Sequence, residues 1–296
     1  MDFDKSRVVK FLIWTFVLAY IIQVGVWRLY QSGNVAIGQL VLAAMMFVPM
    51  LGVLLSGGKL SGMGWKPQIK KNIKTILIVW FAPIILTAIG AAIYFIIFPG
   101  HFDLSGSALV ANAGSEALRQ LEAQGLTYPM YILSNIIGCI TYAPLLNGFF
   151  AIGEEAGWRG FLYPQLKAKL GRRNGRILGG SIWGAWHWPI IWLIGYEYGT
   201  EYFGFPVVGM LLFCVIAIAI GIFCDWVYER SESIWLPSIL HGAINAAATI
   251  PVAVCMPDTG SARLLGPAPN GIIAGLPFLV VAVVLLLHEK KERHSF

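Results

Sequence analysis

The sequence predicts an all-α polytopic membrane protein, and three observations support that prediction. Hydrophobic residues make up 57% of the chain and charged residues only 12%, about half the charged share of an average soluble domain. Apolar runs of about 20 residues, long enough to cross a bilayer as a helix, recur along the whole chain. Basic residues gather in alternate connections between these runs, as they do in membrane proteins.

We expect about eight transmembrane helices, one for each apolar run. The fourth begins near Pro129, a residue suited to the first turn of a helix, because the missing N–H would have no intrahelical partner there. The seventh is the least regular, since Pro237 and Pro251 interrupt it. The predicted spans are residues 8–27, 35–55, 74–98, 129–152, 177–195, 206–228, 234–254 and 271–288.

The basic residues set the expected orientation. All but three of the 21 lie in connections and chain ends on one side of the predicted spans, the exceptions being Arg28, Arg119 and Arg263. The positive-inside rule assigns the basic side to the cytoplasm, so both termini are expected there. We therefore predict an integral protein of the plasma (inner) membrane, with the lipid bilayer as its partner. This topology also accounts for the net charge of +6 without nucleic acid.

The connection 99–128 is the one long segment expected on the non-cytoplasmic side. Its centre, residues 107–125, is predicted to form a short helix on the membrane surface or to be mobile. No internal repeat or linker divides the chain, which predicts a single membrane domain over residues 1–296.

Three polar clusters interrupt the apolar segments, and ionisable groups there are expensive enough to be functional candidates. The first is EEAGWR, residues 154–159, at the end of the fourth run. Glu155 and Arg159 are four residues apart, so on a helix they can form an ion pair. Glu154 points about 100° away from Glu155 on a helix and is left free to act as a base. The alternative is an ordinary charge cluster where a helix leaves the membrane.

The second cluster surrounds His187, which lies about 15 Å into the fifth run at about 1.5 Å per residue. Trp183, four residues earlier, shares its helical face. Pro189 cannot donate a hydrogen bond to the carbonyl of Ala185, so the helix is expected to kink there. The alternative is a histidine with a packing role alone.

The third cluster pairs His241 with Asn245, four residues apart and therefore on one helical face. Its alternative is a simple hydrogen-bond pair between helices. By the predicted topology all three clusters fall in the cytoplasmic half of the bilayer, an agreement that three unrelated structural roles would not produce. Glycines spaced four apart, such as Gly180 and Gly184, allow helices to pack closely around them. We therefore predict a compact polar catalytic cavity open to the cytosol.

The residue types of this cavity suit hydrolysis of a carbonyl group. A carboxylate such as Glu154 can take a proton from water, and a histidine can orient the same water. A second histidine and an amide, His241 and Asn245, can stabilise an oxyanion. No serine or cysteine near the clusters stands in a nucleophile motif, so direct attack by water on a peptide bond is preferred. Zinc held by Glu154, His187 and His241 is the competing arrangement.

The three clusters resemble the signature motifs of the CPBP family, the CAAX protease and bacteriocin-processing (Abi) intramembrane proteases related to type II CAAX prenyl endopeptidases. The resemblance covers about residues 135–255, and its motifs read E-E-x-x-x-R, F-x-x-x-H and H-x-x-x-N. Trp183 stands where the second motif has phenylalanine. The matching residues are Glu154, Glu155, Arg159, His187, His241 and Asn245.

The resemblance implies an intramembrane endopeptidase in which Glu154 is the general base and His187 helps to activate water. His241 and Asn245 would support the oxyanion, and the supporting residues would be Glu155, Arg159 and Trp183. The expected partner is a peptide or protein substrate, which can be lipidated. No cofactor is expected, with zinc as the alternative.

Two other functions fit the same residues. A non-catalytic membrane scaffold or bacteriocin-immunity factor would bind a peptide in the cavity without cutting it. A proton-coupled transporter would use the glutamate and histidines as relays, but transporters usually contain internal repeats, and we find none in the sequence.

Overall fold

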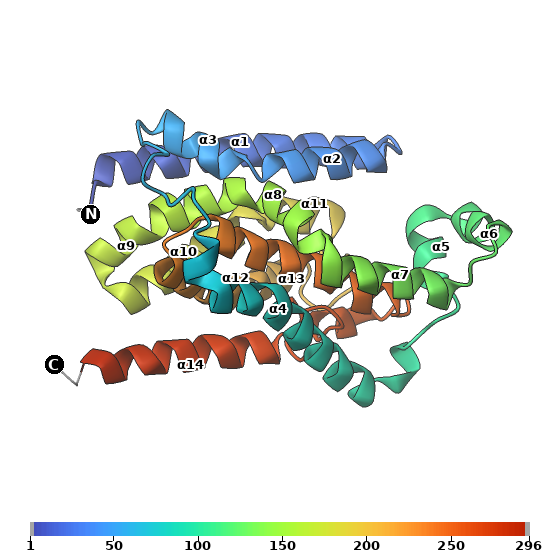
Figure 1. Cartoon of the computed structure of the whole chain (residues 1–296). Coiled ribbons are helices and arrows are strands. Elements are labelled where there is room, and N and C mark those ends of the chain that lie inside the picture. Colours follow the sequence, from blue (N-terminus) through green and yellow to red (C-terminus); the bar gives the residue numbers. More distant parts are fainter. Residues whose placement is uncertain (1–2, 294–296) are drawn as a thin grey trace.

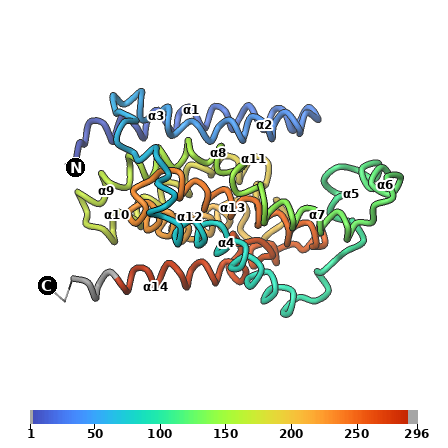
Figure 2. Tube along the Cα trace, in the orientation of Figure 1, coloured from blue at the N-terminus to red at the C-terminus, as the bar shows by residue number. Residues whose placement is uncertain are grey.

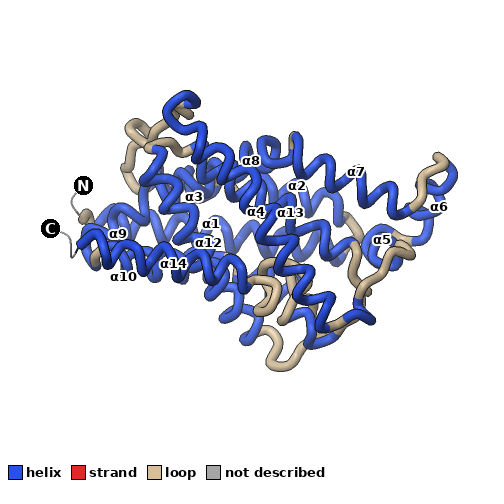
Figure 3. The backbone as a smooth tube through the Cα atoms, turned by 60° about the horizontal axis from the view of Figure 1, so that its bottom comes forward, coloured by secondary structure: helices blue, strands red, loops and turns tan. Residues whose placement is uncertain are grey.

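The computed structural model describes residues 3–293, and within that range the chain is helical and forms no strand (Figure 3). An isolated bridge joins Phe102 to Cys255. The elements are α1 (Lys5–Gln31), α2 (Val35–Met45), α3 (Val48–Leu55), α4 (Ile69–Ile97), η1 (Pro99–His101), α5 (Ser107–Ala113), α6 (Ser115–Ala123), α7 (Tyr128–Thr141), α8 (Ala143–Gly157), η2 (Trp158–Leu162), α9 (Tyr163–Leu170), α10 (Arg172–Trp186), α11 (Trp188–Ile194), α12 (Val207–Ser231), α13 (Trp235–Ala253), η3 (Gly260–Leu264) and α14 (Leu276–Arg293).

The all-α membrane class is confirmed, but the count of eight spans is not. In the described chain, α1, α4, α12 and α13 are each long and apolar enough to cross a membrane. Two bent pairs, α2 with α3 and α7 with the helix that follows it, raise the number to six if each pair is one span. The fifth apolar run is broken at His187, and the last apolar helix starts only at Leu276 because residues 271–275 form a turn.

The helices are arranged around α13, which packs against α8 on one side and α4 on another. Helix α12 packs against α10 and α14. In Figure 1, α1 with α2 and α3 forms one outer layer and α14 lies on the opposite side of the bundle. The helices that carry the three sequence motifs, α8, α10 and α13, therefore lie in the interior.

Helix α1 begins and α14 ends at the same end of the bundle, where α9 turns into α10 (Figure 2). This arrangement agrees with the prediction that both ends lie on one side. That this side is cytoplasmic stays a prediction.

The long connection 99–128 lies at the other end of the bundle (Figure 1). Its centre, predicted to be one short helix or mobile, forms the two short helices α5 and α6. The break between α5 and α6 lies at Gly114, whose φ of +82° is in the region that favours glycine.

Glycines allow the interior helices to approach closely. A Cβ on Gly180 would lie 2.5 Å from Cα of Ile218, so α10 and α12 touch through their backbones. The same holds for α13 and α8, since a Cβ on Gly242 would lie 2.2 Å from the backbone nitrogen of Gly148. The close packing predicted from the glycine spacing is therefore confirmed for Gly180.

Replacing Gly242 with Ala should destabilise the fold, because two backbones would have to separate to admit one methyl group. We expect a cost of about 1–3 kcal/mol, the usual range for overpacking a close contact. Thermal unfolding of the detergent-solubilised protein measures it. Gly25→Ala in α1 is the matched control, because no atom lies within 4 Å of the added Cβ. A G242A protein as stable as G25A would contradict the contact.

A buried ionic cluster ties α9, α10 and α12 together. Asp225 accepts hydrogen bonds from Lys167 Nζ at 2.7 and 2.8 Å and from Arg176 Nε. Glu229, one turn later on α12, binds Lys167, Arg172 and Arg176. The side chains of Asp225 and Arg176 have no exposed surface. Asp225 lies inside the sixth predicted span, and the sequence analysis did not single it out.

Candidate active site

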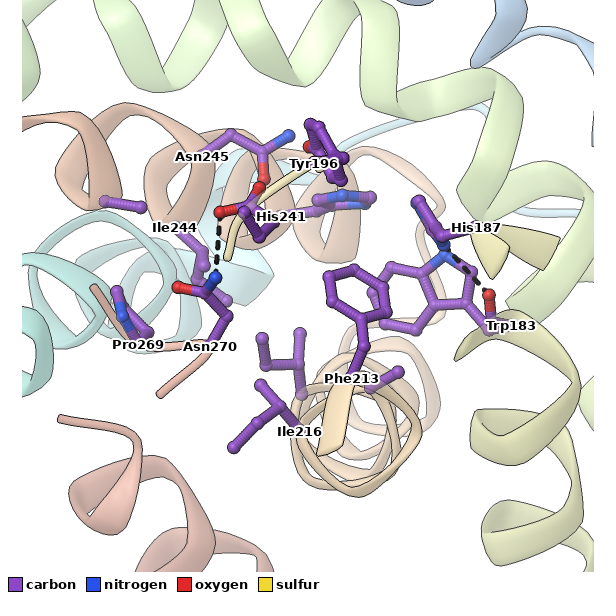
Figure 4. Close-up of a pocket in the computed structure, with 14 residues that line it drawn as sticks. Trp183, His187, Tyr196, Phe213, Ile216, His241, Ile244, Asn245, Pro269 and Asn270 are labelled. Carbon is purple, nitrogen blue, oxygen red and sulfur yellow. Dashed lines mark hydrogen bonds between the residues drawn. The ribbon is translucent and has the colours of Figure 1, made fainter. Parts of the chain in front are cut away.

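The second and third motifs line one cavity of about 80 Å³ between α10, α12 and α13, and the first motif adjoins it through the hydrogen bond between Glu154 and Trp183. His187, His241 and Asn245 all line it, as does Trp183. In Figure 4, His187 and Trp183 lie on one side of the cavity and Asn245 and Asn270 on the other, with Phe213 between them. The predicted cavity is therefore present, and its position relative to the two membrane faces stays a prediction.

The ion pair predicted from the helical spacing forms at the back of the site. Arg159 Nη1 donates to Glu155 Oε1 at 3.0 Å, and neither side chain has any exposed surface. The guanidinium also lies 4.3 Å from the centre of the Trp183 ring, a distance typical of a cation–π contact. Glu155 Oε1 accepts a second hydrogen bond, from His241 Nδ1 at 2.9 Å. Glu155 therefore links the arginine of the first motif to the histidine of the third.

Glu154, next in the chain, is held by two indoles. Its Oε2 accepts hydrogen bonds from Trp183 Nε1 at 2.6 Å and from Trp158 Nε1 at 3.2 Å. The side chain is 2% exposed and does not itself line the cavity. Its Oε1 accepts no hydrogen bond from the part of the chain that the structure describes. Glu154 thus adjoins the cavity through its hydrogen bond to Trp183, with one oxygen left for a further donor.

Trp183 contacts Glu154, Arg159 and both histidines of the site. Its indole N–H binds Glu154, its ring lies under Arg159, and its ring centre is 5.2 Å from that of His241. Its backbone carbonyl is 3.0 Å from His187 Nδ1. A phenylalanine, which the family motif has at this position, has no N–H to donate to Glu154.

His187 sits at the break between α10 and α11, where the predicted kink is found. The backbone carbonyl can only accept, so the contact with Trp183 makes Nδ1 the protonated nitrogen. Its Nε2 is then free to accept a proton or orient a water. The ring packs among Trp186, Phe213 and Tyr196, which fix its orientation.

Gln23 of α1 supports this break, and the sequence analysis missed it. Its Nε2 donates to the carbonyl of Trp186 at 2.8 Å, and its Oε1 accepts from the N–H of Ile190 at 2.8 Å. Tyr20, one turn earlier, donates to the carbonyl of Ala185, the group freed by Pro189. A glutamine with no exposed surface in an apolar helix was the available signal.

Replacing Gln23 with Leu should leave the Trp186 carbonyl and the Ile190 N–H unpaired in the interior. Each buried unpaired group costs about 1–3 kcal/mol, so a clear drop in thermal stability is expected. The His187 ring should also lose its fixed position, which lowers kcat more than it raises KM. Gln39→Leu on exposed α2 is the control for the change of residue type. A Gln23→Leu protein with unchanged melting and turnover would contradict this role.

Three features of the site bear on metal binding. Glu154, His187 and His241 were the predicted zinc ligands if a metal is present. Here Glu154 Oε2 binds two indoles, and His241 Nδ1 binds Glu155. Among the residues that the structure describes, no three His, Cys, Asp or Glu side chains are grouped to hold a metal ion.

Two further polar residues line the cavity that the motifs do not include, Glu197 and Asn270. They lie in the connections that follow α11 and precede α14. Asn270 Nδ2 donates to Glu197 Oε2 at 2.9 Å. Single polar residues in connections carry no motif, so the sequence alone gave no reason to place them in the site.

Comparison with known proteins covers the same region as the motifs. Residues 133–247 match the family model described as type II CAAX prenyl endopeptidase Rce1-like. A protein of Methanococcus maripaludis named CAAX prenyl protease 2 is 28% identical over 138 residues. That alignment covers 46% of this chain and 46% of the relative, so the match spans about half the length of each. The resemblance inferred from the motifs is thereby confirmed, and it covers the part of the chain that carries them.

Proposed function

We propose that this protein is an intramembrane endopeptidase that hydrolyses a peptide bond with activated water. The observation that supports the proposal best is that two of the motifs line one cavity and the first motif is hydrogen-bonded to its wall. His187, His241 and Asn245 line it, and Glu154 is bound to the Trp183 side chain that forms part of its wall. The similarity to the type II CAAX family points to the same chemistry.

Water activation falls to Glu154 and His187. A water at the cavity wall can donate to Glu154 Oε1, since Oε2 is occupied by Trp158 and Trp183. The free Nε2 of His187 accepts from the same water and directs its oxygen at the substrate carbonyl. Glu154 takes the proton as the C–O bond forms and passes it to the amide nitrogen as the C–N bond breaks. The products are a carboxylic acid and an amine, which become a carboxylate and an ammonium group by proton exchange.

Asn245 and His241 stabilise the negative charge that develops on the carbonyl oxygen. The Asn245 amide is a neutral donor at the cavity surface. His241 donates from Nε2 only when both ring nitrogens are protonated. Glu155 fixes the orientation of this ring, because its carboxylate accepts the Nδ1–H at 2.9 Å. Arg159 in turn holds Glu155 in place.

We propose that the reaction needs no metal. Purified protein should contain far less than one zinc per chain by elemental analysis, and cleavage should survive incubation with EDTA and 1,10-phenanthroline. Stoichiometric zinc, with activity lost on chelation and restored by zinc, would contradict this. The apo and zinc-supplemented proteins should also melt at the same temperature, because no preformed ligand set is available to be stabilised.

The substrate is proposed to be a membrane-associated protein or peptide, processed at the cytoplasmic side of the plasma membrane. The name of the Methanococcus maripaludis relative, CAAX prenyl protease 2, makes a C-terminally lipidated peptide the first one to test. An unlipidated peptide of the same sequence is the comparison.

The test is cleavage by protein reconstituted in liposomes. Peptides with and without a lipid group are incubated with wild-type protein, and products are identified by mass spectrometry. New amino and carboxyl termini are expected. Peptide that binds, measured by fluorescence anisotropy, but is never cut would support a scaffold or immunity factor and overturn the protease.

A further inference from the structure

The cavity contains a carboxylate that the proposed hydrolysis does not use. Glu197 lines it together with His187, His241 and Asn245 but lies outside the three motifs. Among the described residues that line the cavity, it is the only one with a carboxylate, and none is a lysine or arginine. Glu197 is therefore the acidic group that the described lining of the cavity offers to a ligand, and no basic side chain of that lining competes for it.

The backbone around Glu197 is fixed in an unusual conformation. Its φ of +69° is in the left-handed region, which is costly for a residue other than glycine. Asn270 holds this turn from the facing connection, since its amide donates to Glu197 Oε2 at 2.9 Å and its carbonyl accepts from Tyr198 O–H at 2.9 Å. The Gly199 N–H closes the turn on the carbonyl of Gly195 at 2.7 Å. The Glu197 carboxylate is thus positioned at the cavity before any ligand enters.

The carboxylate has capacity to spare. An ionised carboxylate can accept about four hydrogen bonds, and in the described structure Glu197 accepts them from the side chains of Asn270 and Tyr196. Burial raises the pKa of Glu197 above its usual value, while the neighbouring Tyr196 and Arg263 lower it only in part. The negative charge of Glu197 is therefore only partly compensated by the protein, and a cationic group of a ligand would stabilise it further.

We propose that Glu197 selects peptides with a lysine or arginine side chain close to the scissile bond, an inference that rests on the proposed endopeptidase function. A cavity of about 80 Å³ admits the end of one side chain. Phe213 and Ile216 provide apolar surface for the methylene stem, and Glu197 binds the charged head. Hydrogen bonds between ions are about twice as strong as neutral ones, so this contact discriminates between side chains of equal length.

The test compares paired peptides that differ in one side chain. Cleavage sites are first mapped by mass spectrometry in a randomised decapeptide library incubated with wild-type protein in liposomes. The best peptide is then made with lysine or norleucine at each position flanking the cut. At one position, kcat/KM for lysine should exceed that for norleucine by about tenfold. In Glu197→Gln that ratio should fall to about one.

Glu201→Gln is the matched control, because Glu201 is exposed on the same connection and does not line the cavity. It should keep the wild-type ratio. A wild-type protein indifferent to lysine, or a Glu197→Gln protein that keeps the tenfold ratio, would overturn the proposal.

Failure of the proposed function gives a different result. If wild-type protein cuts no peptide, anisotropy with the same fluorescent peptides decides the role of Glu197 alone. Wild-type protein should then bind the lysine peptides about tenfold more tightly than the norleucine peptides, and Glu197→Gln should bind both equally. Equal binding by wild-type protein would reject the selection by Glu197 as well.

Discussion

Glu154→Gln should lower peptide cleavage by at least about 100-fold, the lower end of what a general base contributes. The amide has almost the same shape as the carboxylate, and its oxygen can still accept from Trp158 and Trp183. It cannot take a proton from water. The loss should appear in kcat, because the cavity lining that contacts the peptide is unchanged. Initial rates on the mapped peptide measure it.

Two comparisons isolate the chemistry from the fold. The melting temperature of Glu154→Gln should stay close to that of wild-type protein. Trp183→Phe, which removes one hydrogen bond to Glu154 but leaves the carboxylate, should cost about tenfold. This is the lower end of the about 1.5–3 kcal/mol that a hydrogen bond to a charged group is worth, because Trp158 remains. A Glu154→Gln protein that keeps more than a tenth of its activity would remove Glu154 from the role of base.

Asp225→Asn should cause the largest loss of stability. Asp225 has no exposed surface and compensates Lys167 and Arg176. Removing one partner of a buried ion pair costs about 3–5 kcal/mol, because the remaining charge stays buried. We expect the melting temperature in detergent to fall on the order of 10 °C. Circular dichroism during heating, at one scan rate for all variants, measures the change.

An exposed ion pair provides the control. The side chains of Lys71 and Glu232 are 51% and 68% exposed although their charged atoms are 2.6 Å apart. Solvent screens such a pair, so Lys71→Gln should leave the melting temperature unchanged. If Asp225→Asn and Lys71→Gln have the same melting temperature, the cluster between α9, α10 and α12 does not hold these helices together.

The features that were predictable from the sequence are those set by local spacing. Glu155 and Arg159 are four apart on a helix, and they form the expected ion pair. Pro189 and His187 mark the break between α10 and α11. The second and third motifs lie at similar depths in their apolar runs, and this similarity predicted that His187 and His241 share one cavity.

The features that could not be predicted depend on contacts between distant parts of the chain. Gln23 binds residues more than 160 positions away, and nothing in its own helix indicates the partner. Asp225 lies in the sixth apolar run, and its role could not be predicted because its partners, Lys167 and Arg176, are on α9 and α10. The attachment of Glu155, and not Glu154, to His241 depends on how α8 and α13 cross. The count of eight spans was not confirmed because mean hydropathy reveals neither the break at His187 nor the turn at residues 271–275.

The π-helical segment η2 joins α8 to α9 and sets how far the side chains of α9 are rotated about the helix axis relative to those of α8. A π turn holds about one residue more than an α turn, and each residue rotates the next side chain by about 100°. Before this segment, Glu154 and Glu155 point toward the motif residues of α10 and α13, and after it Lys167 points toward Asp225 on α12. With regular α-helix over residues 158–162, the second half would be out of step with the first. The extra residue lets one helix present the motif glutamates at one level of the bundle and Lys167 to the ionic cluster at another.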